Sequence, residues 1–114
     1  MYKDNTNDTT QILLDSLPEF PGGESGYEAF IKKVIHYPSN AKEYHIQGKI
    51  WLSFVIEKNG RVTNFHVERG ISEDLNKEAL RVMYLSPKWK PAIYKKKPVR
   101  VKYFMPISFK LTNQ

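Results

Sequence analysis

The sequence predicts an α+β fold, in which a three-stranded antiparallel sheet carries helices packed on one face and the last strand lies at an edge. Three observations lead to this prediction. Residues 98–111 alternate apolar and polar side chains, residues 49–68 contain two strand-like runs joined by a tight turn, and residues 26–35 and 72–85 place apolar side chains at helical spacing.

Length and composition restrict the class of protein. The 114 residues suffice for one domain with a modest core. No apolar run reaches the roughly 20 residues that span a bilayer. The chain has no cysteine, which excludes disulfides, thiolate metal sites and a cysteine nucleophile. The net charge of +6 suits an acidic partner, a nucleic acid, an anionic membrane surface or a wall polymer, or it serves solubility alone.

The first 17 residues are expected to form a flexible lead-in or a short apolar segment before a domain that spans 18–114. Residues 1–11 are rich in Asn, Thr and Asp and have little to bury. A small apolar cluster follows, made of Ile12, Leu13, Leu14 and Leu17. The two prolines and two glycines of residues 18–23 then predict turns.

Two helices are predicted next. Ser25 and Glu28 have the spacing of a capping box, which predicts a helix over 26–35. Its apolar stripe is expected to pack on the sheet and consists of Tyr27, Phe30, Ile31 and Val34. After Pro38, Ser39 is expected to cap a short helix over 40–45, with Ala41 and Tyr44 facing inward.

A hairpin is predicted over residues 49–68. The first strand, 49–57, places its even-numbered apolar residues inward, and Trp51 and Val55 suggest that its second face is also partly covered. Asn59-Gly60 readily takes the positive φ values of a tight turn. The return strand, 62–68, is expected to bury Phe65 and Val67.

The third helix starts at residues 72–74, where acidic side chains favour a helix N-terminus, and ends near residue 85. Its predicted buried stripe consists of Leu75, Ala79, Val82 and Met83. Residues 87–97, which include Trp89 and three consecutive lysines, are expected to form a loop.

The last strand is the expected meeting place with a partner. Its odd-numbered residues are apolar and predicted to face the core, whereas Pro106 places the strand at an edge or at a bulge. The missing N–H of Pro106 predicts that the backbone groups of the even set face the free edge, with the odd set paired to residues 62–68. The candidate binding residues are Arg100, Lys102, Phe104, Pro106, Ser108 and Lys110.

The order of several motifs resembles the C-terminal domain of the TonB energy transducers. These motifs are PEFPGG at 18–23, YPSNAKEYHIQGKI at 37–50, the hairpin FVIEKNGRVTNFHVERG, EALR at 78–81, PKWKPA, and the final PVRV and PISFKL. The resemblance covers about residues 18–111 and implies the fold predicted above.

The resemblance also implies a function. Such a domain grips the TonB box, a short extended peptide of an outer-membrane transporter, by adding it to the exposed sheet edge. Force from the proton gradient then reaches the transporter for nutrient import. The implied location is periplasmic, with an inner-membrane anchor that interacts with an ExbB-ExbD-type motor complex. The family also places part of the binding surface just before its Tyr-Pro motif, here His36 and Tyr37; the alternatives are a solvated helix end for His36 and a core aromatic for Tyr37.

Other functions receive less support. No enzyme and no cofactor are expected, because the three histidines fall on different predicted elements without metal-ligand spacing or a nucleophile motif. Nucleic-acid binding would use the basic residues of 88–102 with Trp89, Tyr94 and Phe104 as stacking platforms, but no nucleic-acid motif is present, and Trp89 could equally be a plug under a loop. A docking domain of a membrane sensor or peptidase, and a homodimer through the edge strand, remain open alternatives.

Overall fold

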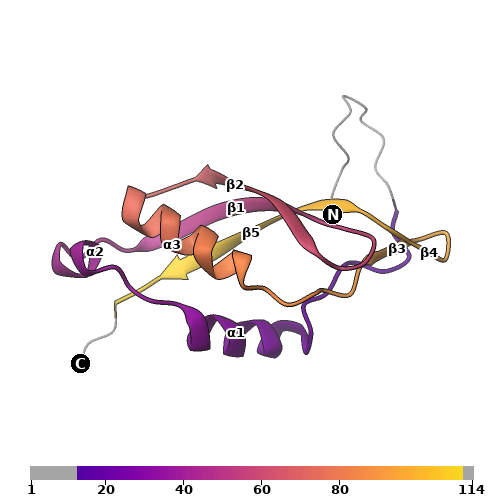
Figure 1. Cartoon of the computed structure of the whole chain (residues 1–114), viewed down its shortest axis with the longest axis horizontal. Helices are drawn as coiled ribbons and strands as arrows, with labels where there is room; N and C mark the ends of the chain where they lie inside the picture. Colours follow the sequence, from indigo (N-terminus) through magenta and orange to yellow (C-terminus); the bar gives the residue numbers. More distant parts are fainter. Residues whose placement is uncertain (1–12, 112–114) are drawn as a thin grey trace.

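The computed structural model describes residues 13–111 (Figure 1). Expectations for residues 1–11 and Ile12 lie outside the described residues. The elements, in chain order, are α1 (Gly23–Val34), α2 (Ser39–Glu43), β1 (Gly48–Ile56), β2 (Val62–Arg69), α3 (Glu73–Tyr84), β3 (Ala92–Tyr94), β4 (Lys97–Val99) and β5 (Val101–Phe109).

The main sheet confirms the predicted fold class. Its three antiparallel strands follow the order β2-β1-β5, so the last strand lies at an edge. The expectation that this strand pairs with residues 62–68 is wrong, because its neighbour is β1. Strand β1 takes the central place, and its side chains from Ile50 to Ile56 are all buried except that of Trp51.

The register shows which backbone groups of β5 remain available. The Glu57 N–H, just after β1, donates to the carbonyl oxygen of Arg61, just before β2. The backbone N–H and C=O groups of the odd-numbered residues of β1 therefore point toward β2, and those of the even-numbered residues point toward β5. Ile50 lies opposite Ile107, and the pairing passes Pro106 without a register shift. The odd residues of β5 therefore bond to β1, and the even residues point their backbone groups to the free edge, as expected.

The strand predicted over 98–111 is interrupted. Residues 97–99 form β4, which pairs with β3 in a separate hairpin, and β5 begins only at Val101. The expected loop over 87–97 is thus partly wrong. Lys95 and Lys96 take φ values of 51° and 66°, the left-handed conformation that a tight hairpin turn requires. The sequence hides this turn because lysines stand where Asn-Gly is usual.

The two first helices begin earlier than expected. Helix α1 starts after Gly22, whose φ is 82°, and the Ser25 hydroxyl donates to the carbonyl of Gly22, so the capping box does not form. Ser39 lies inside α2 rather than capping it, and Tyr44 is exposed rather than inward. For α3 the Ser72 hydroxyl accepts a hydrogen bond from the Leu75 N–H, and the predicted stripe is buried.

The core lies between the sheet and the helices. In Figure 1, α3 crosses β1, whereas α1 lies alongside the C-terminal half of β5. An aromatic cluster joins Phe54, Trp89 and Phe20, with ring centroids 5.5–5.8 Å apart. The hairpin turn supports it: Gly60 has a φ of 91°, and a Cβ there would lie 2.1 Å from the carbonyl oxygen of Trp89. Asn59 does not share this positive φ, contrary to expectation.

The segment before α1 is tied to the small hairpin. Ser16 bridges to Ile93, and Glu19 bridges to Lys90. Leu14 packs against the core, whereas Leu13 and Leu17 are 78% and 61% exposed. The predicted apolar cluster is therefore only partly buried, and Leu17 is left beside the start of β5.

Candidate functional site

The candidate site is the free edge of β5, the side opposite β1. Among residues 13–111, no strand pairs with this edge. Lys102, Phe104, Pro106 and Ser108 lie on the face of β5 away from the core, and Lys110 follows the strand. Phe104 is 49% exposed, and the Lys102 ammonium lies 5.3 Å from the centre of its ring. The edge therefore offers unpaired backbone groups next to a basic and aromatic surface.

Arg100 occupies a different position from the other predicted binding residues. It lies between β4 and β5, and its guanidinium donates to both carboxylate oxygens of Glu57 at 2.9 and 3.1 Å. Hydrogen bonds from Arg100 and from the Thr63 hydroxyl lower the pKa of Glu57 to about 2. Arg100 thus ties the start of β5 to the β1–β2 hairpin.

His36 and Tyr37 lie between α1 and α2, and their side chains have different surroundings. The His36 side chain is exposed, but its backbone N–H donates to a Glu78 carboxylate oxygen at 2.6 Å. The Tyr37 hydroxyl donates to the carbonyl of Ile46. The rings of Tyr37 and Phe109 pack edge to face, with their centroids 5.6 Å apart. Tyr37 therefore helps to pack the core and also reaches the surface beside β5.

A buried carboxylate holds this segment in place. Glu78 in α3 accepts hydrogen bonds from the Arg81 guanidinium at 2.8 Å as well as from His36. Burial alone would raise the pKa of Glu78, but these hydrogen bonds and the charge of Arg81 outweigh burial and lower it. Because Arg81 also donates to the carbonyl of Val34, this network joins α3 to the end of α1.

A groove of about 1000 Å³ separates α1 from the second half of β5. We call it the α1 groove. It is lined by Ser25, Tyr27, Glu28, Ala29, Ile31, Lys32, Ile35, Tyr37, Pro106, Ile107, Ser108 and Lys110. The Tyr27 hydroxyl is buried here without a hydrogen-bond partner among the described residues, and burial raises its pKa to about 12. An unsatisfied buried hydroxyl costs about 1–3 kcal/mol of stability.

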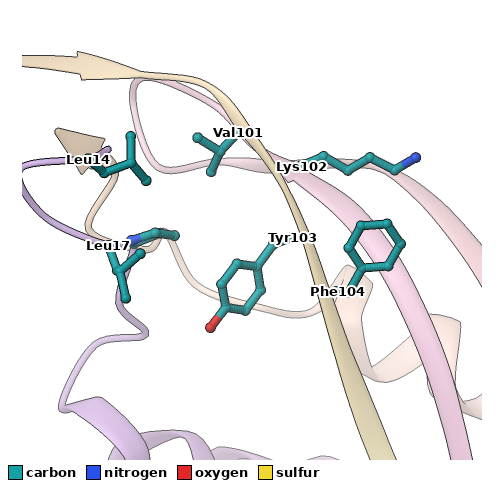
Figure 2. A pocket seen from close by; sticks show the side chains of 7 residues that line it. Leu14, Leu17, Val101, Lys102, Tyr103 and Phe104 are labelled. Carbon is teal, nitrogen blue, oxygen red and sulfur yellow. The ribbon is translucent and has the colours of Figure 1, made fainter. Parts of the chain in front are cut away.

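A smaller hollow of about 220 Å³ lies at the first half of β5 (Figure 2). We call it the N-terminal hollow. It is lined by Leu14, Leu17, Pro18, Val101, Lys102, Tyr103 and Phe104. Figure 2 shows Tyr103 extending from one side of β5 toward Leu17, whereas Lys102 and Phe104 extend from the other side.

The structure also bears on other functions. The three histidines lie before α2, after α2 and in β2, and within residues 13–111 no three His, Asp or Glu side chains gather as metal ligands. Trp89 is 5% exposed and packs against Phe54, so it is a plug in the core and not an open stacking platform. Tyr94 is partly buried, with the Lys95 ammonium 5.4 Å from its ring centre.

The sequence interpretation missed the residues opposite β5. Four of the predicted binding residues, Tyr37, Pro106, Ser108 and Lys110, line the α1 groove together with residues of α1. One feature of the sequence indicated that α1 contributes to the groove: its apolar stripe contains Tyr27, whose side chain ends in a polar hydroxyl. Leu14 and Leu17 were identified as part of an apolar cluster, but nothing in the sequence placed them beside β5, because segments far apart in the sequence form that hollow only in three dimensions.

Comparisons with known proteins agree with this architecture. The family described as Gram-negative bacterial TonB protein C-terminal matches residues 33–111. A solution structure of the Helicobacter pylori TonB C-terminal domain, residues 179–285, is 27% identical over 76% of this chain and 78% of that chain, with a TM-score of 0.52. A second solution structure of the Helicobacter pylori TonB C-terminal domain, residues 194–285, is 26% identical, covers 79% of this chain and 95% of that chain, and has a TM-score of 0.54.

Two further findings complete the comparison. A search of curated proteins gives no match. In the part of the chain that the structure describes, no helix has the length and apolarity needed to cross a bilayer. The family match extends over more than half of the sequence and includes both β1 and β5. This chain belongs to the family of TonB C-terminal domains.

Proposed function

We propose that this chain is the periplasmic partner-binding domain of an energy transducer and binds the TonB box of outer-membrane transporters by β-strand addition to β5. The observation that supports this most is the free edge itself. Lys102, Phe104 and Ser108 direct an N–H and a C=O to that edge, and no described strand pairs with them. An extended peptide satisfies such an edge by continuing the sheet.

Backbone pairing alone does not account for useful affinity. Ladder hydrogen bonds contribute about 1 kcal/mol net each, whereas association costs at least about 4 kcal/mol. About five bonds would thus leave roughly 1 kcal/mol, far below the 4.1 kcal/mol of a millimolar complex. Side chains must supply the rest, and we assign this role to Lys102, Phe104, Ser108 and Lys110, with Tyr37 and His36 at the far end.

The wider role follows from family membership. We infer that an inner-membrane anchor and an ExbB-ExbD-type motor complex act with this domain, and that force passed through β5 opens the transporter for nutrient import. A strand added along β5 is pulled against several backbone hydrogen bonds at once. Such a grip suits a mechanical connection that must also be released.

Pro106 provides the test. It lacks the N–H that the other even residues direct to the free edge, so a bound strand loses one ladder bond there. Pro106→Val should therefore tighten binding of an acidic extended peptide by about fivefold, which corresponds to about 1 kcal/mol. Affinity is measured by isothermal titration, and chemical shifts locate the bound peptide.

A backbone-modified peptide provides the control. N-methylation of the peptide amides that face β5 should abolish binding, whereas N-methylation of the alternate amides should leave it unchanged. Equal binding of both modified peptides would contradict strand addition. Sedimentation of the free chain shows in parallel whether a second copy occupies the same edge as a homodimer.

A further inference from the structure

The two recesses of the site lie at opposite ends of β5. The N-terminal hollow includes Val101, the first residue of β5, and Tyr103 within the strand, whereas the α1 groove includes Ile107. Tyr103 and Ile107 are the nearest odd-numbered residues of the two recesses, so their side chains lie on the same face, four residues apart. At about 3.4 Å per residue, this spacing is about 14 Å. Met105, between them, lines neither recess.

A peptide strand added to the free edge would place its residues directly opposite those of β5, so the spacing of Tyr103 and Ile107 sets the spacing of the peptide side chains that reach the two recesses. Directly opposed residues of neighbouring strands project their side chains to the same face. A peptide residue opposite Tyr103 therefore projects toward the N-terminal hollow, and the residue opposite Ile107 projects toward the α1 groove. The hollow, at about 220 Å³, is smaller than the roughly 300–1,000 Å³ of small-molecule sites, so its size suits a single side chain.

We propose that β5 selects extended peptides with two apolar side chains four residues apart on one face and acidic residues on the other face near both ends. This inference rests on the proposed function. The acidic preference follows from Lys102 at one end of β5 and Lys110 at the other.

Two peptides of one composition test the spacing. The first is acetyl-Asp-Leu-Thr-Ser-Thr-Leu-Asp-amide, which reads the same in both directions and so fits parallel and antiparallel addition. The second, acetyl-Asp-Leu-Thr-Leu-Thr-Ser-Asp-amide, has its leucines two residues apart and can fill only one recess. The first peptide should bind the full chain about tenfold more tightly, because it buries a second leucine.

Variants of the chain link this preference to each recess. Leu17→Ala removes a wall of the N-terminal hollow, and Leu13→Ala removes a similarly exposed leucine that does not line it. Ala29→Leu fills part of the α1 groove, and Lys33→Leu places the same side chain on α1 outside the groove. Leu17→Ala and Ala29→Leu should each reduce the preference at least threefold, whereas both control variants should retain it.

The outcomes separate this inference from the proposed function. Equal, measurable binding of both peptides overturns the spacing rule and leaves strand addition intact. The same holds if the preference persists in Leu17→Ala and Ala29→Leu with peptide chemical-shift changes still on β5. Failure of both peptides to bind overturns the proposed function, and this inference with it.

Discussion

Replacing the buried carboxylate of α3 tests how the segment beside the site is held. In Glu78→Ala, the backbone N–H of His36 loses an acceptor 2.6 Å away, and the Arg81 guanidinium loses two hydrogen bonds of 2.8 Å. Glu78 is 8% exposed, so water replaces its carboxylate poorly. The link from α3 to the end of α1 should therefore weaken.

The structure sets the size of this effect. The Arg81 side chain is 48% exposed, so water screens its charge, and the magnitude is taken from the His36 bond alone. A hydrogen bond to a charged group contributes about 1.5–3 kcal/mol. At about 4 °C per kcal/mol for a domain of this size, the melting temperature should fall by about 6–12 °C.

Urea unfolding followed by tryptophan fluorescence measures the loss in free energy of unfolding, because Trp89 is buried in the core, and a thermal scan measures the change in melting temperature. Glu78→Gln keeps an acceptor oxygen for His36 and should lose less stability than Glu78→Ala. Glu28→Ala, an exposed glutamate of α1, should stay within about 0.5 kcal/mol of the natural chain. If Glu78→Ala were equally stable, the network would not hold the two helices together and the reasoning would be wrong.

Two further predictions concern the hairpin and the α1 groove. The folded-state pKa of Glu57 is about 2, below its ordinary value of 4.5, so its stabilising contribution is complete above pH 4.5 and is lost as the pH falls toward 2. Glu57→Gln should flatten the fall of the urea midpoint over this range, and identical slopes would contradict the role of Arg100 and Thr63. Tyr27→Phe removes the unpartnered hydroxyl and should leave the free domain as stable or up to about 1 kcal/mol more stable in urea unfolding; a loss above that size would show that the hydroxyl has a partner.

Local patterns were sufficient for most of the fold. The even-numbered apolar residues from Ile50 to Ile56 predict a strand because successive side chains point to opposite faces. The strand β1 begins and ends one residue before the predicted 49–57. The stripe of α3 was predicted for the equivalent reason at helical spacing. Pro106 placed β5 at an edge because a proline has no N–H to donate to a neighbouring strand.

The sequence-based predictions were wrong where two neighbouring sequence features indicate different structures. Ser25 had the spacing of a helix cap, but the left-handed Gly22 starts α1 earlier and leaves that serine inside the first turn. The alternation of residues 98–111 continues through Arg100, although the chain changes sheets there and that side chain pairs with Glu57. Periodicity records which face a residue occupies, but it does not record which strand lies next to it.

The sequence by itself determined the faces of β5, its place at an edge and the family of the domain. Only the tertiary structure decided that β1 is its neighbour and that two recesses, one at Tyr103 and the other at Ile107, lie along β5. The physical reason is that each recess is formed by segments distant in sequence: Leu17 and Tyr103 line the N-terminal hollow, and α1 and Ile107 line the α1 groove. Their approach depends on packing of the whole chain, which no local pattern records.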